Sequence, residues 1–413
     1  GASSAALTGV GVTFPILSIV IAFANLFGTG GAPLFSIARG RGDDAHAADI
    51  MGNTFTMLLG TGLVLTALVL AFKKPLLYLF GASDATFPYA DGYLTIYLCG
   101  TVFVMLGLGM NNFINAQGFG SMGMITVLLG AVVNIILDPV FIFALGMGVQ
   151  GAALATVISQ FTSAILCLIH LMRTKEEYQL HISKIRFDGR VLGEIIRNGV
   201  PSGFQNSVIS IANVFVQTNI NAFGKMAMAG CGSYSKIEGF AFLPVTCFTM
   251  ALTTFVSQNL GAKQYDRAKK GARFGILCSI VIAELIGVLI YVAAPTLIAA
   301  FNGDPEVIHY GVMQARTIAL FYFLLAFSHC IAAVLRGSGH AAVPMIVMLC
   351  VWCLFRVSYI TLAVRLIPDI RVIFWAYPLT WSISSVIFLI YFLKADWLHN
   401  FDRLEAKQQA KAA

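Results

Sequence analysis

The chain contains eleven long runs of predominantly apolar residues, each bounded by charged residues, Gly or Pro. A helix needs roughly 20 such residues to cross a bilayer, whereas the strands of a membrane barrel alternate apolar and polar residues. These runs do not alternate, so they predict membrane-spanning helices. The predicted spans are 7–38, 48–72, 89–115, 121–145, 149–172, 194–222, 227–257, 271–294, 309–335, 341–366 and 370–394.

Composition and charge agree with an all-α polytopic membrane protein. Hydrophobic residues make up 58% of the chain and charged residues 11%, against about 45–50% and about 25% in soluble domains. The loops that we assign to the cytoplasm carry 18 Lys and Arg residues, and the opposite side carries five. This bias predicts a multi-pass protein of the cell (inner) membrane with the central linker and the C-terminus in the cytoplasm. It also accounts for the net charge of +7 without a nucleic-acid partner.

The two halves of the sequence resemble each other in the same order. Ala6 to Gly9 face Ala227 to Gly230 at an offset of 221, and Gly40 faces Gly261. Gly118 is paired with Gly337, which indicates that the offset drifts to 219. The second half contains one additional leading helix, whose counterpart would precede Gly1, so eleven of twelve helices are expected here. Six helices per repeat place both repeats in the same orientation in the membrane.

This reasoning divides the chain into four parts. They are an N-terminal half-bundle at 1–172 that lacks its first helix, a cytoplasmic linker at 173–193, a C-terminal half-bundle at 194–394 and a cytoplasmic tail at 395–413.

The run VVNIILDPVFIF at 132–143 places polar groups inside an apolar span. Asn134 and Asp138 are four residues apart and share one face of a helix. An intramembrane carboxylate costs roughly 2.5–3.5 kcal/mol, so it is expected to face the bundle interior. Pro139 obstructs the carbonyl of residue 135 and should free it. These oxygens suit Na⁺, and protonation of Asp138 would suit an H⁺ mechanism; both remain open.

The second repeat serves as an internal control for Asp138. Its counterparts, at offsets of 219 to 222, lie among Val357 to Ile360 and include no acid. The fold therefore does not require an acid there, which favours a coupling role over the alternative of a structural hydrogen bond between helices.

The chain resembles the multidrug and toxic compound extrusion (MATE) family, prokaryotic type. The resemblance rests on the ARG and NLGA loops, on NIILDPVFIF and on GVQGAALATVISQ. It implies a secondary antiporter that exports bulky organic or cationic drugs in exchange for Na⁺ or H⁺ by alternating access. It also implies a cation site, with possible Na⁺ binding, at Asp138, Asn134 and Thr156, with Tyr93 nearby. The remaining Asp of that site would belong to the absent helix.

Other polar residues in the spans are candidates for contact with substrate or protons. Glu238 is a second intramembrane acid with Lys236 close in sequence, and Glu284 is a lone acid in an apolar span. Structural pairing or helix packing is the alternative for each candidate. The remaining candidates are Gln205, Asn206, Asn111, Asn115 and Arg356.

The leading hypothesis is therefore a multidrug efflux antiporter that acts as a monomer in the lipid bilayer. Its expected partners are small organic molecules, and it needs no cofactor beyond the coupling ion. A related flippase for lipid-linked oligosaccharides is the alternative, and it predicts a strongly cationic cavity. A membrane-embedded enzyme is disfavoured, because the spans contain no HExxH, GxSxG or paired His.

Overall fold

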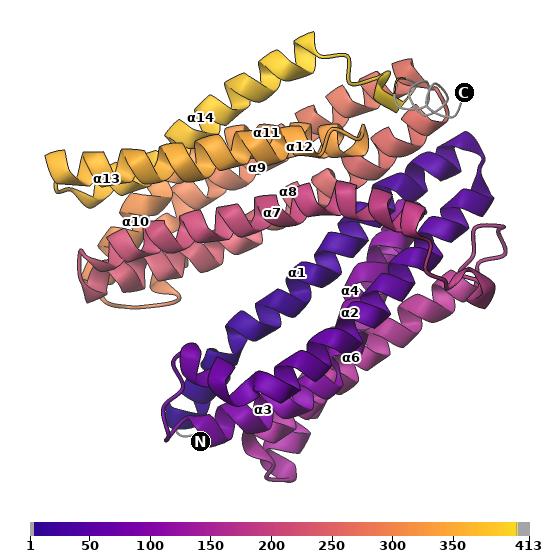
Figure 1. Cartoon of the computed structure of the whole chain (residues 1–413). Coiled ribbons are helices and arrows are strands. Elements are labelled where there is room, and N and C mark those ends of the chain that lie inside the picture. The colour runs from indigo at the N-terminus through magenta and orange to yellow at the C-terminus, as the bar shows by residue number, and fades with distance from the viewer. Residues whose placement is uncertain (1–3, 402, 404–413) are drawn as a thin grey trace. The chain divides into compact units, whose positions relative to one another are not determined.

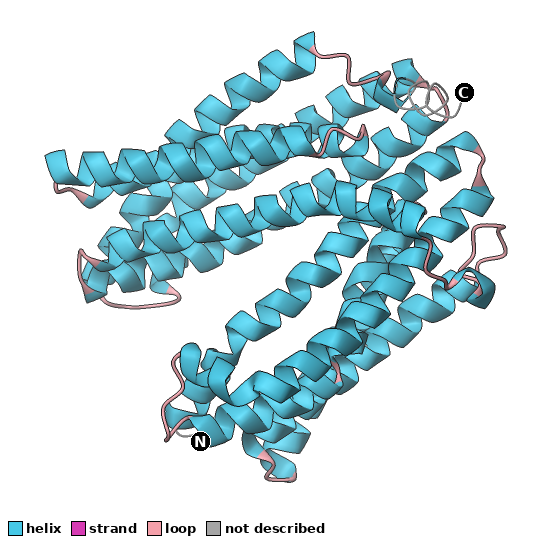
Figure 2. Cartoon of the chain, viewed as in Figure 1, coloured by secondary structure: helices cyan, strands magenta, loops and turns pink. Residues whose placement is uncertain are grey.

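A computed structural model describes residues 4–401 and 403, and within them every regular element is a helix (Figure 2). The prediction of an all-α fold is thus confirmed. The first repeat comprises α1 (Ser4–Arg41), α2 (Asp44–Leu79), α3 (Phe87–Cys99), α4 (Thr101–Ala116), α5 (Gly120–Pro139), η1 (Val140–Ala144) and α6 (Gly148–Arg173). The short η2 (Ile182–Lys184) and α7 (Gly189–Asn221) follow. The second repeat comprises α8 (Lys225–Gly261), α9 (Tyr265–Ala299), α10 (Pro305–Ile318), η3 (Ala319–Phe321), α11 (Tyr322–Gly337), α12 (Ala342–Met348), η4 (Leu349–Phe355), α13 (Arg356–Leu366) and α14 (Ile370–Lys394).

Contacts divide the chain into two compact units, Gly1–Gly203 and Phe204–Ala413. The division lies inside α7, two residues after Pro201. In the first unit, α4 packs against both α2 and α6, and Figure 1 shows these helices in dark to light purple. In the second unit, α8 packs against α9, α10 and α11.

All eleven predicted spans are helical, but they are not equally apolar. Among the described residues, nine helices are long and apolar enough to cross a membrane. The bent pair of α3 and α4, which turns by 55° at Gly100, brings the number to ten. Helix α7 is the predicted span that is left out, because it carries Asn, Gln and Ser residues along much of its length.

Close backbone contacts recur in the two units at a constant offset of 221. An added Cβ at Gly9 would meet the Thr86 carbonyl at 2.9 Å, and one at Gly230 would meet the Val307 carbonyl at 2.5 Å. The hydroxyl of Ser36 donates to the Ala116 carbonyl, as that of Ser257 does to the Gly337 carbonyl. These equivalences confirm the internal repeat.

The predicted drift of the offset to 219 is wrong. Gly118 and Gly339 both adopt a positive φ, +92° and +82°, at the turn between equivalent helices. Glycine tolerates this conformation without steric cost, so the two positions correspond by backbone geometry. The sequence match of Gly118 with Gly337 followed local composition and not the turn.

A π-helical segment interrupts the fifth helix of each repeat. In the first repeat it is η1, which begins directly after Pro139. In the second repeat it is η4, which begins without a proline. Such segments widen the helix locally and are frequent at functional sites.

A close backbone contact in the first unit joins α1 to α7. An added Cβ at Gly30 would meet the Ile195 carbonyl at 2.5 Å, and one at Gly199 would meet the Leu26 carbonyl at 2.2 Å. The Asn198 side chain donates to the Gly30 carbonyl at 3.0 Å. Glycine is needed on both helices because their backbones touch.

The segment after each repeat folds back onto that repeat. After α6, Tyr178 lies under the Arg39 guanidinium at 3.8 Å from the ring centroid, and Lys184 and Arg186 both pair with Asp49. After α14, the Asn400 side chain donates to the Ser338 carbonyl at 2.9 Å. The tail is stabilised internally by Asp396, which binds His399 and Arg403.

Candidate functional site

The polar cluster of the first unit lies on α3, α5 and α6. The Asn134 amide donates to the Asp138 carboxylate at 3.5 Å, so the two residues do share one face of α5. The Tyr93 hydroxyl interacts with the side chain of Thr156 and lies close enough to Asp138 to interact with its charge. The structure therefore brings together four residues, of which the first and the last, Tyr93 and Thr156, are 63 positions apart in the sequence.

Each member of this cluster is held by its own helix. The Thr156 hydroxyl donates to the Ala152 carbonyl at 2.9 Å, which leaves its oxygen lone pairs free to accept. Tyr93 is 8% exposed and stacks on Tyr97 with 6.2 Å between ring centroids. Asp138 is half-buried. A carboxylate, an amide and two hydroxyls form a set of oxygen ligands that can accept a proton or a hard cation.

The equivalent positions of the second repeat have different chemistry. At the structural offset of 221, Asp138 corresponds to Tyr359 and Thr156 to Tyr377. The second unit instead has Glu238 on α8, whose counterpart in the first repeat is Leu17, and Glu284 on α9. The two repeats therefore place their intramembrane acids on different helices.

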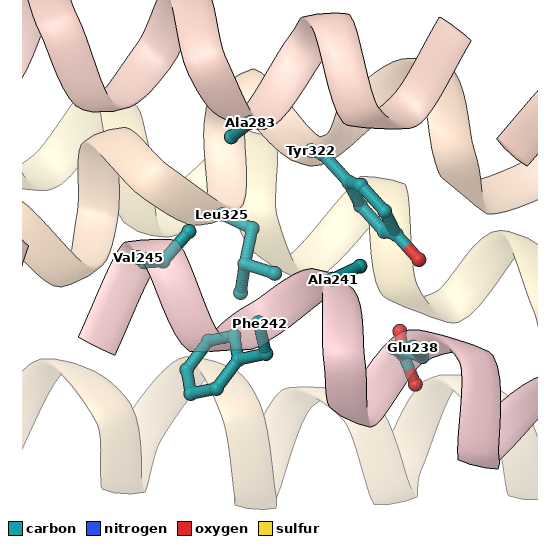
Figure 3. A pocket seen from close by; sticks show the side chains of 7 residues that line it. All are labelled: Glu238, Ala241, Phe242, Val245, Ala283, Tyr322 and Leu325. Carbon is teal, nitrogen blue, oxygen red and sulfur yellow. The ribbon is translucent and has the colours of Figure 1, made fainter. Parts of the chain in front are cut away.

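Glu238 lies at one end of a pocket between α8, α9 and α11. The Tyr234 hydroxyl donates to the Glu238 carboxylate at 3.5 Å and lies 2.8 Å from the Tyr322 hydroxyl. Figure 3 shows Glu238 and Tyr322 at the same end of the pocket, whose other walls are apolar. The lining residues are Glu238, Ala241, Phe242, Val245, Ala283, Tyr322 and Leu325. The cavity volume is about 10 Å³, which is room for roughly one water molecule.

Arg356 is buried near Glu238, at the start of α13. Its side chain is 1% exposed, and its guanidinium donates to the Thr380 hydroxyl at 2.8 Å. The guanidinium also lies 4.7 Å from the Tyr377 ring centroid and 5.2 Å from that of Trp352. Within the described residues, Arg356 and Glu238 form no direct ion pair, but they are close enough to interact electrostatically.

Lys236 does not pair with Glu238. It is exposed, and its ammonium lies 5.3 Å from the Phe301 ring centroid. The two residues are separated by two positions on α8, which places them on different faces of the helix.

Glu284 has a structural contact. Its carboxylate accepts the backbone N–H of Phe323 at 3.2 Å, next to the break between η3 and α11. A break in a membrane helix leaves backbone groups without partners, and a side chain that satisfies one stabilises the break. This contact uses one of the Glu284 oxygens.

The four predicted amide residues fall into three places. An added Cβ at Gly123 would meet the side-chain oxygens of Asn115 and Asn111 at 2.6 and 2.9 Å, so both lie where α4 packs against α5. Gln205 is buried and accepts from Arg336 at 3.5 Å. Asn206 is exposed on another face of α7. The structure thus does not bring these amides together with Asp138 or Glu238 into one hydrogen-bonded cluster of described residues.

Sequence reasoning missed most of the partners of Glu238 and Arg356. They are Tyr234 for Glu238, and Thr380, Trp352 and Tyr377 for Arg356. Aromatic residues are common in membrane spans, so none is distinctive alone. The internal repeat did offer one signal for these partners. Tyr377 occupies the position in the second repeat that Thr156, a predicted site residue, occupies in the first.

Comparison with known proteins gives consistent results. A family profile described as MatE matches residues 1–140 and 201–361. The probable multidrug resistance protein YoeA of Bacillus subtilis is 24% identical over 94% of this chain and 85% of its own length. A FAD transporter of Shewanella oneidensis is 25% identical over 84% of this chain and 77% of its own length. A crystal structure of MATE in the bent conformation covers 100% of this chain and 90% of its own, with a TM-score of 0.87 and 21% identity.

Proposed function

Because the chain belongs to the MatE family, we propose that it is a membrane exporter of small organic compounds driven by the entry of a cation. The names of its relatives support this proposal, since they include a probable multidrug resistance protein. The protein would act as a monomer in the cell membrane, with its central linker and C-terminus in the cytoplasm. The coupling ion would be Na⁺ or H⁺, and export would proceed by alternating access.

The observation that carries the proposal is the environment of Asp138. Its carboxylate sits within an apolar helix, at hydrogen-bond distance from Asn134 and near the Tyr93–Thr156 pair. An acid in a membrane span is costly unless it has a function or a partner. Among the described residues, no basic side chain forms an ion pair with it. Asp138 is therefore available to bind a proton or Na⁺, with Asn134 and Thr156 as further oxygen ligands.

The role of the acid would be to link ion occupancy to conformation. A charged, empty Asp138 is poorly solvated by the surrounding helices, whereas a protonated or Na⁺-bound one carries no net charge. The conformation that exposes the site to water therefore favours the empty form. The conformation that buries it favours the occupied form, and this difference in affinity is what can couple the ion to export.

Uptake of a dye into inside-out vesicles containing the protein tests the proposal, because export from the cytoplasmic side becomes accumulation inside such vesicles. A cationic dye such as ethidium should be transported under an imposed Na⁺ gradient or an imposed H⁺ gradient, and the comparison identifies the ion. Asp138→Asn should abolish ion-driven transport at unchanged protein levels. Asp84→Asn is the matched control, because Asp84 lies outside the spans and, among the described residues, its side chain hydrogen-bonds only to Tyr78. Full transport by the Asp138 variant under both gradients would overturn the coupling role.

A further inference from the structure

Three basic side chains lie close together on α9, in its second and third turns. They are Lys269, Lys270 and Arg273, and all three are exposed. Residues three or four positions apart are neighbours on a helix surface, so Arg273 lies beside both lysines. The only acid between residues 262 and 283 is Asp266, and among the described residues no ion pair joins it to them. The group therefore keeps a net positive charge in the described part of the chain.

Beyond this basic group, the same face of α9 is apolar and exposed. Phe274 is 71% exposed, Leu277 is 59% exposed and Val281 is 49% exposed. Phe274 follows Lys270 by four positions, and Leu277 follows Arg273 by four, so the apolar residues continue the basic stripe along the helix. Since α9 is long and apolar enough to cross a membrane, this stripe should contact acyl chains. The basic group should then lie at the level of the lipid headgroups.

In the first unit, the linker covers the equivalent place on α2. At the offset of 221, Lys270 corresponds to Asp49. The Asp49 carboxylate pairs with Lys184 at 3.0 Å and with Arg186 at 3.1 Å, both from the linker. An added Cβ at Gly52, one turn later, would collide with the Lys184 carbonyl. The first unit therefore covers this face with its own segment of opposite charge.

The face of α9 needs a different occupant, because its charge is opposite to that of α2. The chain after residue 403 does not match it in charge, since residues 404–413 contain one Glu and two Lys. A lipid with an anionic headgroup matches both the basic group and the apolar stripe. Clusters of Lys and Arg beside a membrane helix attract the anionic lipids of the cytoplasmic leaflet. The orientation proposed above places this end of α9 in that leaflet.

We propose that Lys269, Lys270 and Arg273 bind the phosphate of an anionic membrane phospholipid, one acyl chain of which lies along Phe274 and Leu277. The guanidinium can donate two parallel hydrogen bonds to a phosphate, and the two ammonium groups add charge and further donors. The apolar residues hold the chain by contact with lipid-sized surface. This inference goes beyond the proposed export function, because binding of the lipid requires neither a coupling ion nor a substrate.

Fluorescence quenching by brominated lipids tests this inference in the full-length protein in nanodiscs. Leu277→Trp places a probe beside the basic group. Leu289→Trp places one about three turns further along α9, at a side chain that is 64% exposed. The signal of the unsubstituted protein, with its four tryptophans, is subtracted from each. Brominated phosphatidylglycerol should bind at position 277 about fivefold or more tightly than brominated phosphatidylcholine, since each basic residue at such a surface contributes about that factor. At position 289 the two lipids should bind equally.

Substitution of the basic group shows whether it causes the preference. In the Leu277→Trp background, the triple substitution Lys269→Gln, Lys270→Gln and Arg273→Gln should make the affinities of the two lipids equal. The double substitution Lys269→Arg and Lys270→Arg keeps the charge, so it should keep the preference. All of these side chains are exposed, so the variants should unfold at the same temperature as the parent protein.

A second triple variant is the matched control for net charge. Arg173→Gln, Lys175→Gln and Arg190→Gln remove three exposed basic residues at the two ends of the central linker. The change in net charge is the same, but none of these residues lies on α9. This variant should keep the full preference for phosphatidylglycerol at position 277.

Several results would overturn the site. Equal affinities of the two lipids at position 277 would do so, as would the same preference at positions 277 and 289 or a loss of preference in the control variant. Loss of the preference in millimolar inorganic phosphate, at constant ionic strength, would show a site for free phosphate instead of a lipid. A preference that appears only after Glu405→Gln would show that the C-terminal tail is the occupant.

Discussion

A pair of glycines on α7 gives a quantitative prediction about the contact between α1 and α7. An Ala Cβ at position 199 would lie 2.2 Å from the Leu26 carbonyl oxygen, which is backbone and cannot rotate away. At position 203 the nearest atom would be a Leu26 side-chain carbon at 3.6 Å, an ordinary van der Waals contact. The two substitutions are chemically identical, on the same helix and against the same neighbour.

The expected free-energy changes have opposite signs. To reach a normal contact, Gly199→Ala must move α7 away from α1 by about 1 Å, and overpacking of this kind costs about 1–3 kcal/mol. Movement also weakens the 3.0 Å hydrogen bond from Asn198 to Gly30, worth about 0.5–1.5 kcal/mol. The gain in helix propensity returns up to about 1 kcal/mol. Gly203→Ala receives this gain without a clash.

Thermal unfolding of the protein in detergent measures the difference. Gly199→Ala should lower the melting temperature by roughly 5 °C, given about 2–4 °C per kcal/mol for a unit of this size. Gly203→Ala should leave it unchanged or raise it slightly. Equal melting temperatures for the two variants would refute the argument that the α1 and α7 backbones are in direct contact.

Two further predictions concern the second unit. Tyr234→Phe should destabilise the protein by about 1–3 kcal/mol in a denaturant titration, because the buried Tyr322 hydroxyl loses its partner; the exposed substitution Tyr89→Phe should have no such effect. Docking of the tail should weaken as the pH falls below about 6.5, because burial lowers the pKa of His340 and the unfolded state then binds the proton first. At still lower pH, the tail also loses the contribution of Asp396, whose pKa is lowered mainly by its hydrogen bond to His399. Hydrogen exchange of residues 395–401, corrected for intrinsic rates, should therefore become faster as the pH is lowered from 7 to 5.5. The substitution His340→Gln should remove this pH dependence. Exchange with the same pH dependence in both proteins would argue against the role of His340.

The sequence predicts the helices well because the bilayer fixes their length and polarity. Spans and the internal repeat follow from apolar runs and from recurring glycines. The breaks were not predictable, since the bend at Gly100 and the η3 segment lie inside continuous apolar runs. At the second of these breaks, the backbone N–H of Phe323 donates to Glu284, which only the folded chain brings near.

The candidate site was predictable where its residues share one helix. Asn134 and Asp138 are placed together by a spacing of four, which is local geometry. Partners on different helices were not predictable, because their contacts depend on how each helix is rotated about its own axis. The expected neighbour of Glu238 was Lys236, two positions earlier in the sequence. The actual neighbours are Tyr234, one turn earlier on the same helix, and Arg356 on a distant helix.

The division of the chain inside α7 has a mechanical consequence. A covalent helix, and not a flexible loop, carries the chain from one compact unit to the other. A twisting force on either unit is transmitted along this helix. The helix lacks one backbone hydrogen bond at Pro201, which has no N–H to donate. A turn of helix with one bond missing bends more easily than an intact turn, so the helix that carries the chain from one unit to the other can bend near Pro201.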